Sequence, residues 1–190
     1  MHAELADDLL EAIDSWGVSA GRDGMASQAD WRTLAENPVH LERTAQPSHF
    51  TASALPATAD GARVCLVLHR RLGLWVQPGG HFEPGDSTVA AAAAREMYEE
   101  TGLTGSLSPV PLRLSRHPAP CGIGAWHLDV QLLAVTSDDL PAVSDESLDV
   151  AWFEVDDLPD QMASGVEGLI AAAVTRLAES DPPRPPGPGR

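Results

Sequence analysis

Arg95-Glu96-Met97-Tyr98-Glu99-Glu100-Thr101-Gly102 is the segment from which the fold of this 190-residue chain is best inferred. Its glutamates lie at positions i, i+3 and i+4, so on a helix Glu96, Glu99 and Glu100 share one face. Carboxylates placed this closely repel one another, and a bound divalent cation removes that repulsion. Carboxylate oxygens are also the ligands that Mg²⁺ and Mn²⁺ prefer. The alternative for such a segment is a solvated, acidic helix end.

The helix that carries these acids has a recognisable start and end. Asp86, Ser87 or Thr88 can cap its N-terminus, and Gly102 stands where a C-terminal glycine is favoured. Residues 90–94 between them are consecutive alanines, the best helix formers. Because alanine side chains are small, another element can pack closely against the face opposite the acids. We therefore expect this helix to support the core as well as to carry ligands.

A glycine-rich loop precedes the helix. Residues 75–86 read WVQPGGHFEPGD, a short apolar strand end followed by a segment with three glycines and two prolines. Glycine allows the backbone to approach another group closely, so a carbonyl in this loop can add an oxygen ligand to a cation.

Together, the loop and the helix resemble the sequence box of the Nudix hydrolase family. The family pattern is Gly, five residues, Glu, seven residues, then Arg-Glu-apolar-x-Glu-Glu-x-Gly-apolar, and residues 95–103 match its second half throughout. The first half departs from the pattern, because the arginine follows Gly80 by fifteen positions instead of fourteen. Asp86 or Ser87 then stands where the family has its first glutamate. The loop is similar to a GGH-x-EPGD variant of the box, and the resemblance covers about residues 48–175.

The resemblance implies an α/β fold of the Nudix type, an α/β/α sandwich with a mixed sheet. It also implies a metal-dependent hydrolase that cleaves a phosphoanhydride bond in a nucleoside diphosphate linked to another moiety. Glu96, Glu99 and Glu100 would bind Mg²⁺ or Mn²⁺, with the carbonyl of Gly80 as a further ligand. Arg95 would orient these acids through a forked hydrogen bond and lower their pKa values. Its alternative role is an ordinary ion pair within the helix.

Hydrolysis requires a general base near the metal ions, and Glu146 is the first candidate. It lies six residues before Trp152, and some family members have a metal-binding or catalytic glutamate at that offset. The alternative is a solvated acid in an acidic loop, in which case Glu99 or Glu100 would serve as the base.

Other side chains are candidate substrate contacts. His81 follows the glycine pair and can reach a phosphate or a metal-bound water, unless it only caps the loop backbone. His127 and Asp129 alternate with apolar residues in a strand and so share its polar face, which is turned either toward the site or toward solvent. The arginines that can contact phosphate are Arg70, Arg71 and Arg116, although the alternative for Arg70 and Arg71 is that they only end a strand at a turn. The aromatic residues that can stack on a base, or else fill the core, are Phe50, Trp75, Phe82 and Trp126.

The composition narrows the range of partners. The chain has 28 acidic residues and 12 basic ones, all of them arginine, and a formal net charge of −16. This charge repels nucleic acid polymers and anionic membranes, and no apolar run approaches the ~20 residues of a membrane span. We therefore expect a small-molecule nucleotide or nucleoside diphosphate derivative as partner, together with metal ions.

The chain has two cysteines, Cys65 and Cys121, which do not make a disulfide framework. Its acidic N-terminus lacks the order of a secretory signal. From both features we expect a cytoplasmic protein.

We predict three segments along the chain. Residues 1–45 form a helical extension, with helices over 4–16 and 28–36 that cover a sheet edge or build a homodimer contact. Residues 46–180 form the Nudix domain, and the proline-rich residues 181–190 are disordered. In the domain, strands are expected over 49–55, 63–68, 74–77, 112–115, 126–135 and 150–155, and a last helix over 162–179.

Two other function classes stay open on the same fold. One is a regulatory module that binds a ligand without turnover, which an eroded glutamate set would favour; the set is intact here. The other is a diphosphate isomerase, which needs a catalytic cysteine beside a glutamate in the pocket. Cys65 lies instead in an apolar strand run.

Overall fold

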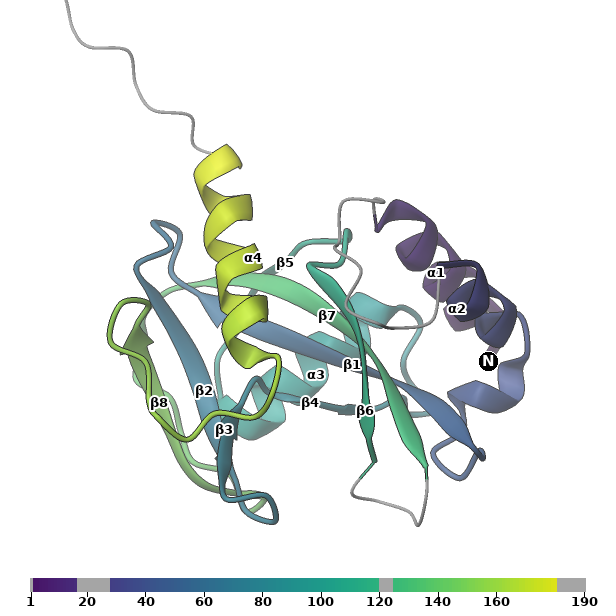
Figure 1. Ribbon diagram of the computed structural model, residues 1–190, viewed down its shortest axis with the longest axis horizontal. Helices are drawn as coiled ribbons and strands as arrows, with labels where there is room; N and C mark the ends of the chain where they lie inside the picture. The colour runs from purple at the N-terminus through teal and green to yellow at the C-terminus, as the bar shows by residue number, and fades with distance from the viewer. Residues whose placement is uncertain (1, 17–27, 120–124, 181–190) are drawn as a thin grey trace, which may run out of the picture.

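The computed structural model describes residues 2–16, 28–119 and 125–180, which form a mixed α/β fold (Figure 1). The elements in chain order are α1 (His2–Ser15), α2 (Gln28–Ala35), the 3-10 helix η1 (Pro38–Leu41), β1 (Ser48–Ala57), β2 (Arg63–His69), β3 (Leu74–Val76), β4 (Gly79–His81), α3 (Val89–Thr101), β5 (Gly105–Leu107), β6 (Arg113–Pro118), β7 (Trp126–Thr136), β8 (Ser147–Glu154) and α4 (Val166–Ser180).

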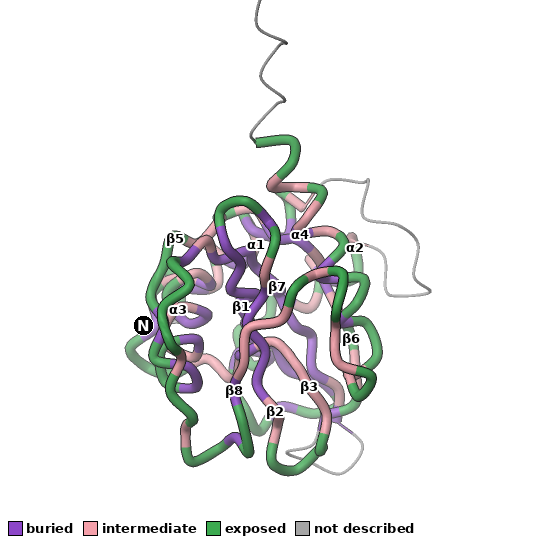
Figure 2. Tube along the Cα trace, turned by 90° about the vertical axis from the view of Figure 1, so that its left-hand side faces the viewer, coloured by how far each residue is buried: buried purple, intermediate pink, exposed green. Residues whose placement is uncertain are grey.

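The sheet is built around the parallel pair β1 and β7. These strands are in register from Ser48 opposite Trp126 to Ala57 opposite Val135, and both are buried along most of their length (Figure 2). The short strands β5 and β6 pair with β7 in antiparallel orientation, and β4 pairs in the same way with β1. On the other side, β2 joins β1 to β3 and β8. The sheet is therefore mixed, as predicted.

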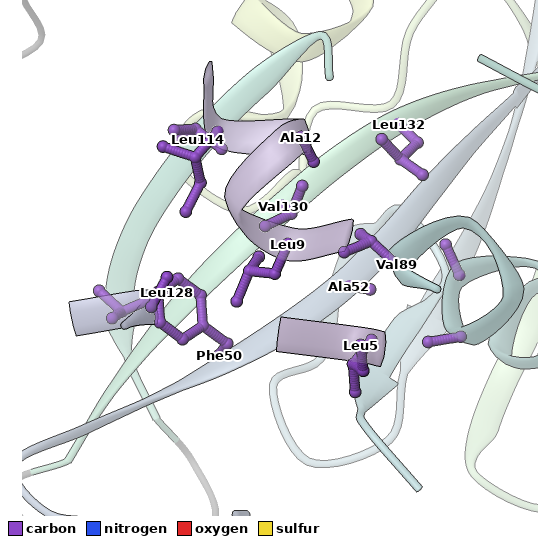
Figure 3. Packing of buried hydrophobic residues seen from close by; sticks show 14 of the residues in the cluster. Leu5, Leu9, Ala12, Phe50, Ala52, Val89, Leu114, Leu128, Val130 and Leu132 are labelled. Carbon is purple, nitrogen blue, oxygen red and sulfur yellow. The ribbon is translucent and has the colours of Figure 1, made fainter. Parts of the chain in front are cut away.

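One face of the sheet is covered by α1, α2 and α3. The alternate residues Phe50, Ala52 and Ala54 of β1 point to this face, where they join one apolar cluster with Leu5 and Leu9 of α1 (Figure 3). The N-terminal helices thus lie over a face of the sheet rather than at its edge. Because they are removed from water, the larger side chains Leu5, Leu9 and Phe50 each contribute roughly 1.5–3 kcal/mol to folding.

The opposite face is covered by α4, so the layers form an α/β/α sandwich (Figure 1). Leu169, Ile170 and Ala173 of α4 pack against Leu55 of β1 and Leu133 of β7. Below this helix, the same face of β1 and β7 changes from apolar to polar residues. The polar stretch forms part of the cavity described in the next subsection.

Local signals account for α3. The Oγ1 atom of Thr88 accepts a hydrogen bond of 3.0 Å from the backbone N–H of Ala91, so Thr88 is the N-cap. Gly102 ends the helix at φ 71°, a left-handed conformation that glycine adopts without strain. Ala92 and Ala93 are fully buried against the sheet. The alanine run therefore allows close packing, as expected.

The structure differs from the prediction at several boundaries. The short strands β4 and β5 were not predicted, since each begins with glycine, a residue that is depleted in strands. The last helix begins at Val166 rather than residue 162, because Met162 bridges to Trp75 of β3. The predicted disorder of 181–190 lies outside the described residues. In the described part of the chain, we find no helix with the length and apolar character that crossing a bilayer requires.

Candidate active site

A cavity of about 670 Å³ lies between the end of α3, the strands β1, β4 and β7, and the loop before β8. Its acidic lining residues are Glu83, Glu96, Glu99, Glu100, Asp129, Asp145 and Glu146. Its basic and imidazole lining residues are Arg43, Arg70, Arg71, His69, His81, His117 and His127. The three glutamates of α3, Gly80, Glu146 and the candidate contacts Arg70, Arg71, His81, His127 and Asp129 therefore meet in one cavity, whereas Arg95, Arg116 and the four aromatic candidates do not line it.

The acids of α3 differ in burial. Glu100 is only 7% exposed, and its Oε2 atom accepts a hydrogen bond of 3.2 Å from the backbone N–H of Gly79. Glu96 is half-buried against Gly80, whereas Glu99 is exposed. A Cβ atom at Gly80 would lie 2.4 Å from Oε1 of Glu96, so any side chain at this position would displace the carboxylate.

Asp86 fixes the arginine of the acidic segment. Both of its carboxylate oxygens accept from Arg95, at 3.2 Å from Nε and 2.9 Å from Nη2, and Oδ2 also accepts from the N–H of Glu83. Arg95 further donates to the carbonyl of His81 at 2.9 Å. Of the two residues that the sequence left open for the first glutamate position of the box, Asp86 thus ties the loop with its extra residue to α3.

Arg95 also contacts two of the glutamates, through Nη1, at 2.9 Å from Glu96 and 3.1 Å from Glu99. The forked hydrogen bond predicted for these acids is made to Asp86 instead. Arg95 lowers the pKa of Glu96, as predicted, but it does not set the net direction of the shift for Glu96 or contribute to that of Glu100. Burial raises the pKa of Glu96 in spite of Arg95. Burial, together with the nearby charge of Glu96, raises the pKa of Glu100 to about 8.

Glu146 lies in the loop before β8 and faces the acids of α3, since its charge contributes to the raised pKa values of Glu96 and Glu100. Arg70 holds this loop. Its Nε and Nη2 atoms donate to the carbonyls of Asp145 and Ser147, each at 3.0 Å. Its backbone N–H donates to the carbonyl of Glu146 at 3.3 Å. The guanidinium predicted to contact phosphate is thus engaged with the backbone.

The polar stretch of β1 and β7 centres on Asp129, which is 3% exposed. Its carboxylate accepts hydrogen bonds from Thr51 at 3.0 Å, Ser53 at 2.8 Å and Gln131 at 3.0 Å. These donors satisfy the buried carboxylate and hold it fixed beside the cavity. The period-two pattern of β7 predicted the position of Asp129, but its partners in β1 were not foreseen.

His81 and His127 approach each other between β4 and β7, with ring centroids 5.1 Å apart. Burial lowers the pKa of His81 to about 4 and that of His127 to about 3, with further lowering from neighbouring imidazoles and Arg43. Both rings are therefore neutral at pH 7. The sequence reasoning missed His49 of β1, which lies beside them, although it alternates with Thr51 on the polar face of that strand.

This arrangement can be compared with known proteins. A family model, the NUDIX domain, matches residues 47–173 of the chain. The chain belongs to the Nudix family.

Solved structures of Nudix proteins share its fold. The NUDIX domain of Shewanella oneidensis NrtR, complexed with ADP ribose, is 22% identical, covers 80% of this chain and 99% of its own, and has a TM-score of 0.59. An Ap4A hydrolase from C. elegans, solved as a binary complex, is 21% identical, covers 68% and 98%, and has a TM-score of 0.58. A MutT NUDIX hydrolase from Burkholderia pseudomallei is 24% identical, covers 66% and 97%, and has a TM-score of 0.55.

Nudix proteins generally use divalent metals, and the residues of this Nudix box suit such an ion. Glu96 and Glu100 bring two carboxylates together, and burial raises the pKa of both because it disfavours their ionised forms. A divalent cation bound between them would stabilise these ionised forms. The absence of a side chain at Gly80 leaves its backbone beside the same carboxylates. Hard oxygen donors thus converge where the Nudix helix meets β4.

Other residues named from the sequence do not line the Nudix cavity. Arg116 lies over the ring of Trp126, with its Cζ atom 4.4 Å from the centroid. Phe50 is fully buried beneath α1, and Trp75 packs on Phe153 at 4.8 Å between ring centroids. Phe82 packs against the same apolar cluster as Phe50. These residues support the domain and do not offer a stacking surface in the cavity.

The cysteines give the Nudix cavity no nucleophile in the described residues. Cys65 is fully buried in β2, and burial raises the pKa of its thiol to about 12. Cys121 lies outside the described residues. The isomerase alternative, which needs a cysteine beside a glutamate in the pocket, therefore gains no support from Cys65.

Proposed function

We propose that this Nudix protein is a Mg²⁺-dependent hydrolase that cleaves a phosphoanhydride bond in a nucleoside diphosphate linked to another moiety. The observation that carries the proposal is the pair of carboxylates Glu96 and Glu100, one half-buried and one buried, facing Glu146 across one cavity. Mn²⁺ is the alternative ion, because it accepts the same oxygen ligands.

In this proposal Glu96, Glu99 and Glu100 hold the metal, with the carbonyl of Gly80 as a further ligand. When bound, Mg²⁺ supplies charge neutralisation for the diphosphate oxygens and lowers the pKa of water. Arg95 has a positioning role, since its bonds to Asp86 and to the carbonyl of His81 fix the orientation from which it contacts the acids. The buried Glu100 carries the charge that most needs the metal.

Glu146 is the proposed general base, which takes the proton of the attacking water. Its exposed side chain lines the cavity opposite α3, and Arg70 fixes the backbone on both sides of it. Arg70 therefore acts on Glu146 by positioning rather than by contact with substrate. Glu99 is the alternative base, because it is the exposed acid of the Nudix helix.

The substrate would lie between the acids and the histidines. Arg71 and Arg43 line the cavity, and their charges suit a phosphate. His81 and His127 are neutral donors or acceptors on the other wall. One similar structure holds ADP ribose, and another similar protein is a hydrolase of Ap4A. Both compounds are nucleotides with a diphosphate or longer phosphate chain, so we propose this class as substrate.

The test is a hydrolysis screen of ADP-ribose, dinucleoside polyphosphates, nucleotide sugars and nucleoside triphosphates, with Mg²⁺ and with Mn²⁺. Product masses in ¹⁸O-water identify the phosphorus that is attacked. We expect metal-dependent turnover that Glu100→Gln reduces at least about a thousandfold, and that Glu146→Gln reduces by about 10²–10⁴-fold.

The matched control is Glu167→Gln, an exposed acid on α4, which should leave turnover unchanged. Nucleotide binding without turnover in the wild type would instead favour the sensor alternative. Arg70→Ala should lower kcat more than it raises KM, because it disturbs the base and not the binding surface. An effect of Arg70→Ala on KM alone would contradict this positioning role.

A further inference from the structure

Three histidines from three strands converge on one point of the cavity wall. His49 of β1, His81 of β4 and His127 of β7 each offer a ring nitrogen, and these three atoms lie within 4.8 Å of one another. The Nε2 atoms of His49 and His81 are 3.2 Å apart. Strand pairing brings them together. In the pairing of β1 with β4, His81 lies opposite Thr51, two residues from His49, and in the pairing of β1 with β7, His127 lies opposite His49 itself.

We propose that His49, His81 and His127 form a second metal site, which binds one transition-metal ion of the Zn²⁺ class and is separate from the carboxylate site. This site goes beyond the proposed hydrolysis and does not depend on it. Imidazole nitrogen suits Zn²⁺, whereas Mg²⁺ prefers oxygen ligands. One cavity would thus hold two chemically distinct metal sites.

The distances fit tetrahedral coordination. With Zn–N bonds of about 2.0–2.1 Å, two nitrogens of a tetrahedral site are about 3.3 Å apart. The Nε2 atoms of His49 and His81 are already 3.2 Å apart. The ring nitrogen of His127 lies within 4.8 Å of the other two, so it needs to approach them by at most about 1.5 Å. The movement falls on side chains, because all three residues are anchored in paired strands.

The hydrogen bonding of His49 sets the correct tautomer for a ligand. Its Nδ1 atom lies 3.2 Å from the carbonyl of Ala45, which can only accept, so Nδ1 carries the proton. The lone pair of His49 is then on Nε2, the atom that faces His81. A metal-binding histidine commonly donates its second nitrogen to a backbone carbonyl in this way.

The protonation and charge of the surroundings also favour a cation. Burial lowers the pKa of all three rings, so each ring is neutral at pH 7 and has one nitrogen lone pair. Because Nε2 of His49 accepts in the contact with His81, Nε2 of His81 donates, and a metal ion there would shift that proton to Nδ1 of His81. Arg43 opposes a cation here, since its charge contributes to each of these shifts. However, seven carboxylates and three arginines line the cavity as a whole, so its net charge attracts metal ions.

The fourth coordination position would open to the cavity. His81 and His127 line the cavity, whereas His49 lies behind them in β1. The neighbouring ring of His117 is 5.3 Å from that of His127, but within the described residues it does not belong to the close group of ring nitrogens. Three protein ligands with one open position are typical of zinc sites that bind a water or a substrate oxygen. The open position would therefore take a water or an oxygen of a ligand bound in the cavity.

The test is calorimetric titration of the full chain with Zn²⁺ in excess Mg²⁺. We use the Glu99→Gln/Glu100→Gln double variant as background, so that the carboxylate site does not take up zinc. We expect one equivalent of Zn²⁺ to bind. Because the loss of a metal's outer-shell partner alone costs 10–100-fold in affinity, His127→Ala should weaken binding at least about a hundredfold. Co²⁺ in place of Zn²⁺ should give the visible absorption of a tetrahedral nitrogen site.

His69→Ala is the matched control, because His69 lines the same cavity outside the cluster and should leave zinc binding unchanged. Should His127→Ala fail to fold, His81→Ala decides, since His81 is less buried. Absence of zinc uptake by the double variant would overturn the proposal, as would uptake that survives loss of a cluster histidine. Neither result bears on magnesium-dependent hydrolysis, which the variants of Glu100 test by themselves.

Discussion

The buried carboxylate of Glu100 should make the metal-free protein less stable as the pH rises, and Glu100→Gln should remove most of that loss. Glu100 is 7% exposed, and burial with the nearby charge of Glu96 raises its pKa from 4.5 to about 8. Glutamine has the shape of the neutral acid, and its amide oxygen can still accept from the N–H of Gly79. The substitution therefore removes the charge but not the packing.

The sign follows from the direction of the shift. A raised pKa means that the folded state holds the proton more tightly than the unfolded state, so this contribution to stability is complete below pH 4.5 and is lost as the pH rises to about 8. A shift from 4.5 to about 8 corresponds to at most about 5 kcal/mol, at 1.36 kcal/mol per pKa unit. Above pH 8 the contribution is constant, because Glu100 is then ionised in both states.

The assay is urea unfolding in the presence of a chelator, at intervals from pH 5 to pH 9. Relative to wild type, Glu100→Gln should gain free energy of unfolding as the pH rises, by a few kcal/mol at pH 9, and very little at pH 5. Glu167→Gln, an exposed glutamate on α4, should follow the wild-type profile. Excess Mg²⁺ should stabilise the wild type at pH 9 more than the variant. Parallel profiles for Glu100→Gln and wild type would refute the reasoning.

Two further substitutions test the geometry and the packing. Gly80→Ala would place a Cβ atom 2.4 Å from Oε1 of Glu96, so the affinity for Mg²⁺ should fall by about 10–100-fold in a calorimetric titration. Gly85→Ala, with no atom within 4 Å of its Cβ position, should bind as wild type does, and equal losses in both would contradict the steric argument. Leu9→Ala removes a fully buried side chain of α1 and should lower the free energy of unfolding by about 2–5 kcal/mol. As a control, Leu140→Ala, at a residue that is 96% exposed, should change the free energy of unfolding by less than about 0.5 kcal/mol. A loss for Leu9→Ala as small as the change for Leu140→Ala would mean that α1 does not share the core.

The sequence was sufficient for those parts of the site that depend on local spacing. The helix with its three acids follows from the i, i+3, i+4 pattern and from its caps at Thr88 and Gly102. The polar face that carries His127 and Asp129 follows from the period of two in β7. In both cases, the residues that act together lie on one element, so their relative positions are set by regular backbone geometry.

The rest of the site depends on long-range pairing, which spacing does not reveal. His49 and His81 meet because β4, a three-residue strand hidden in the glycine-rich loop, pairs with β1. Arg70 was expected to bind phosphate, but it donates to carbonyls of a loop about 75 residues away in the chain. The raised pKa of Glu100 results from burial, which can be measured only after the fold is known.

The central claim is that the acids of α3 bind magnesium against a diphosphate, and calorimetric titration with Mg²⁺ in the presence of a nucleotide tests it most directly. With a pKa of about 8, Glu100 is mostly protonated at pH 7, so an ion bound there must displace the proton. Titrations in buffers of different ionisation enthalpy should show that uptake of Mg²⁺ releases close to one proton at pH 7 and almost none at pH 10. Absence of Mg²⁺ uptake with nucleotide present, or uptake that persists when Glu96 and Glu100 are both replaced by Gln, would contradict the claim.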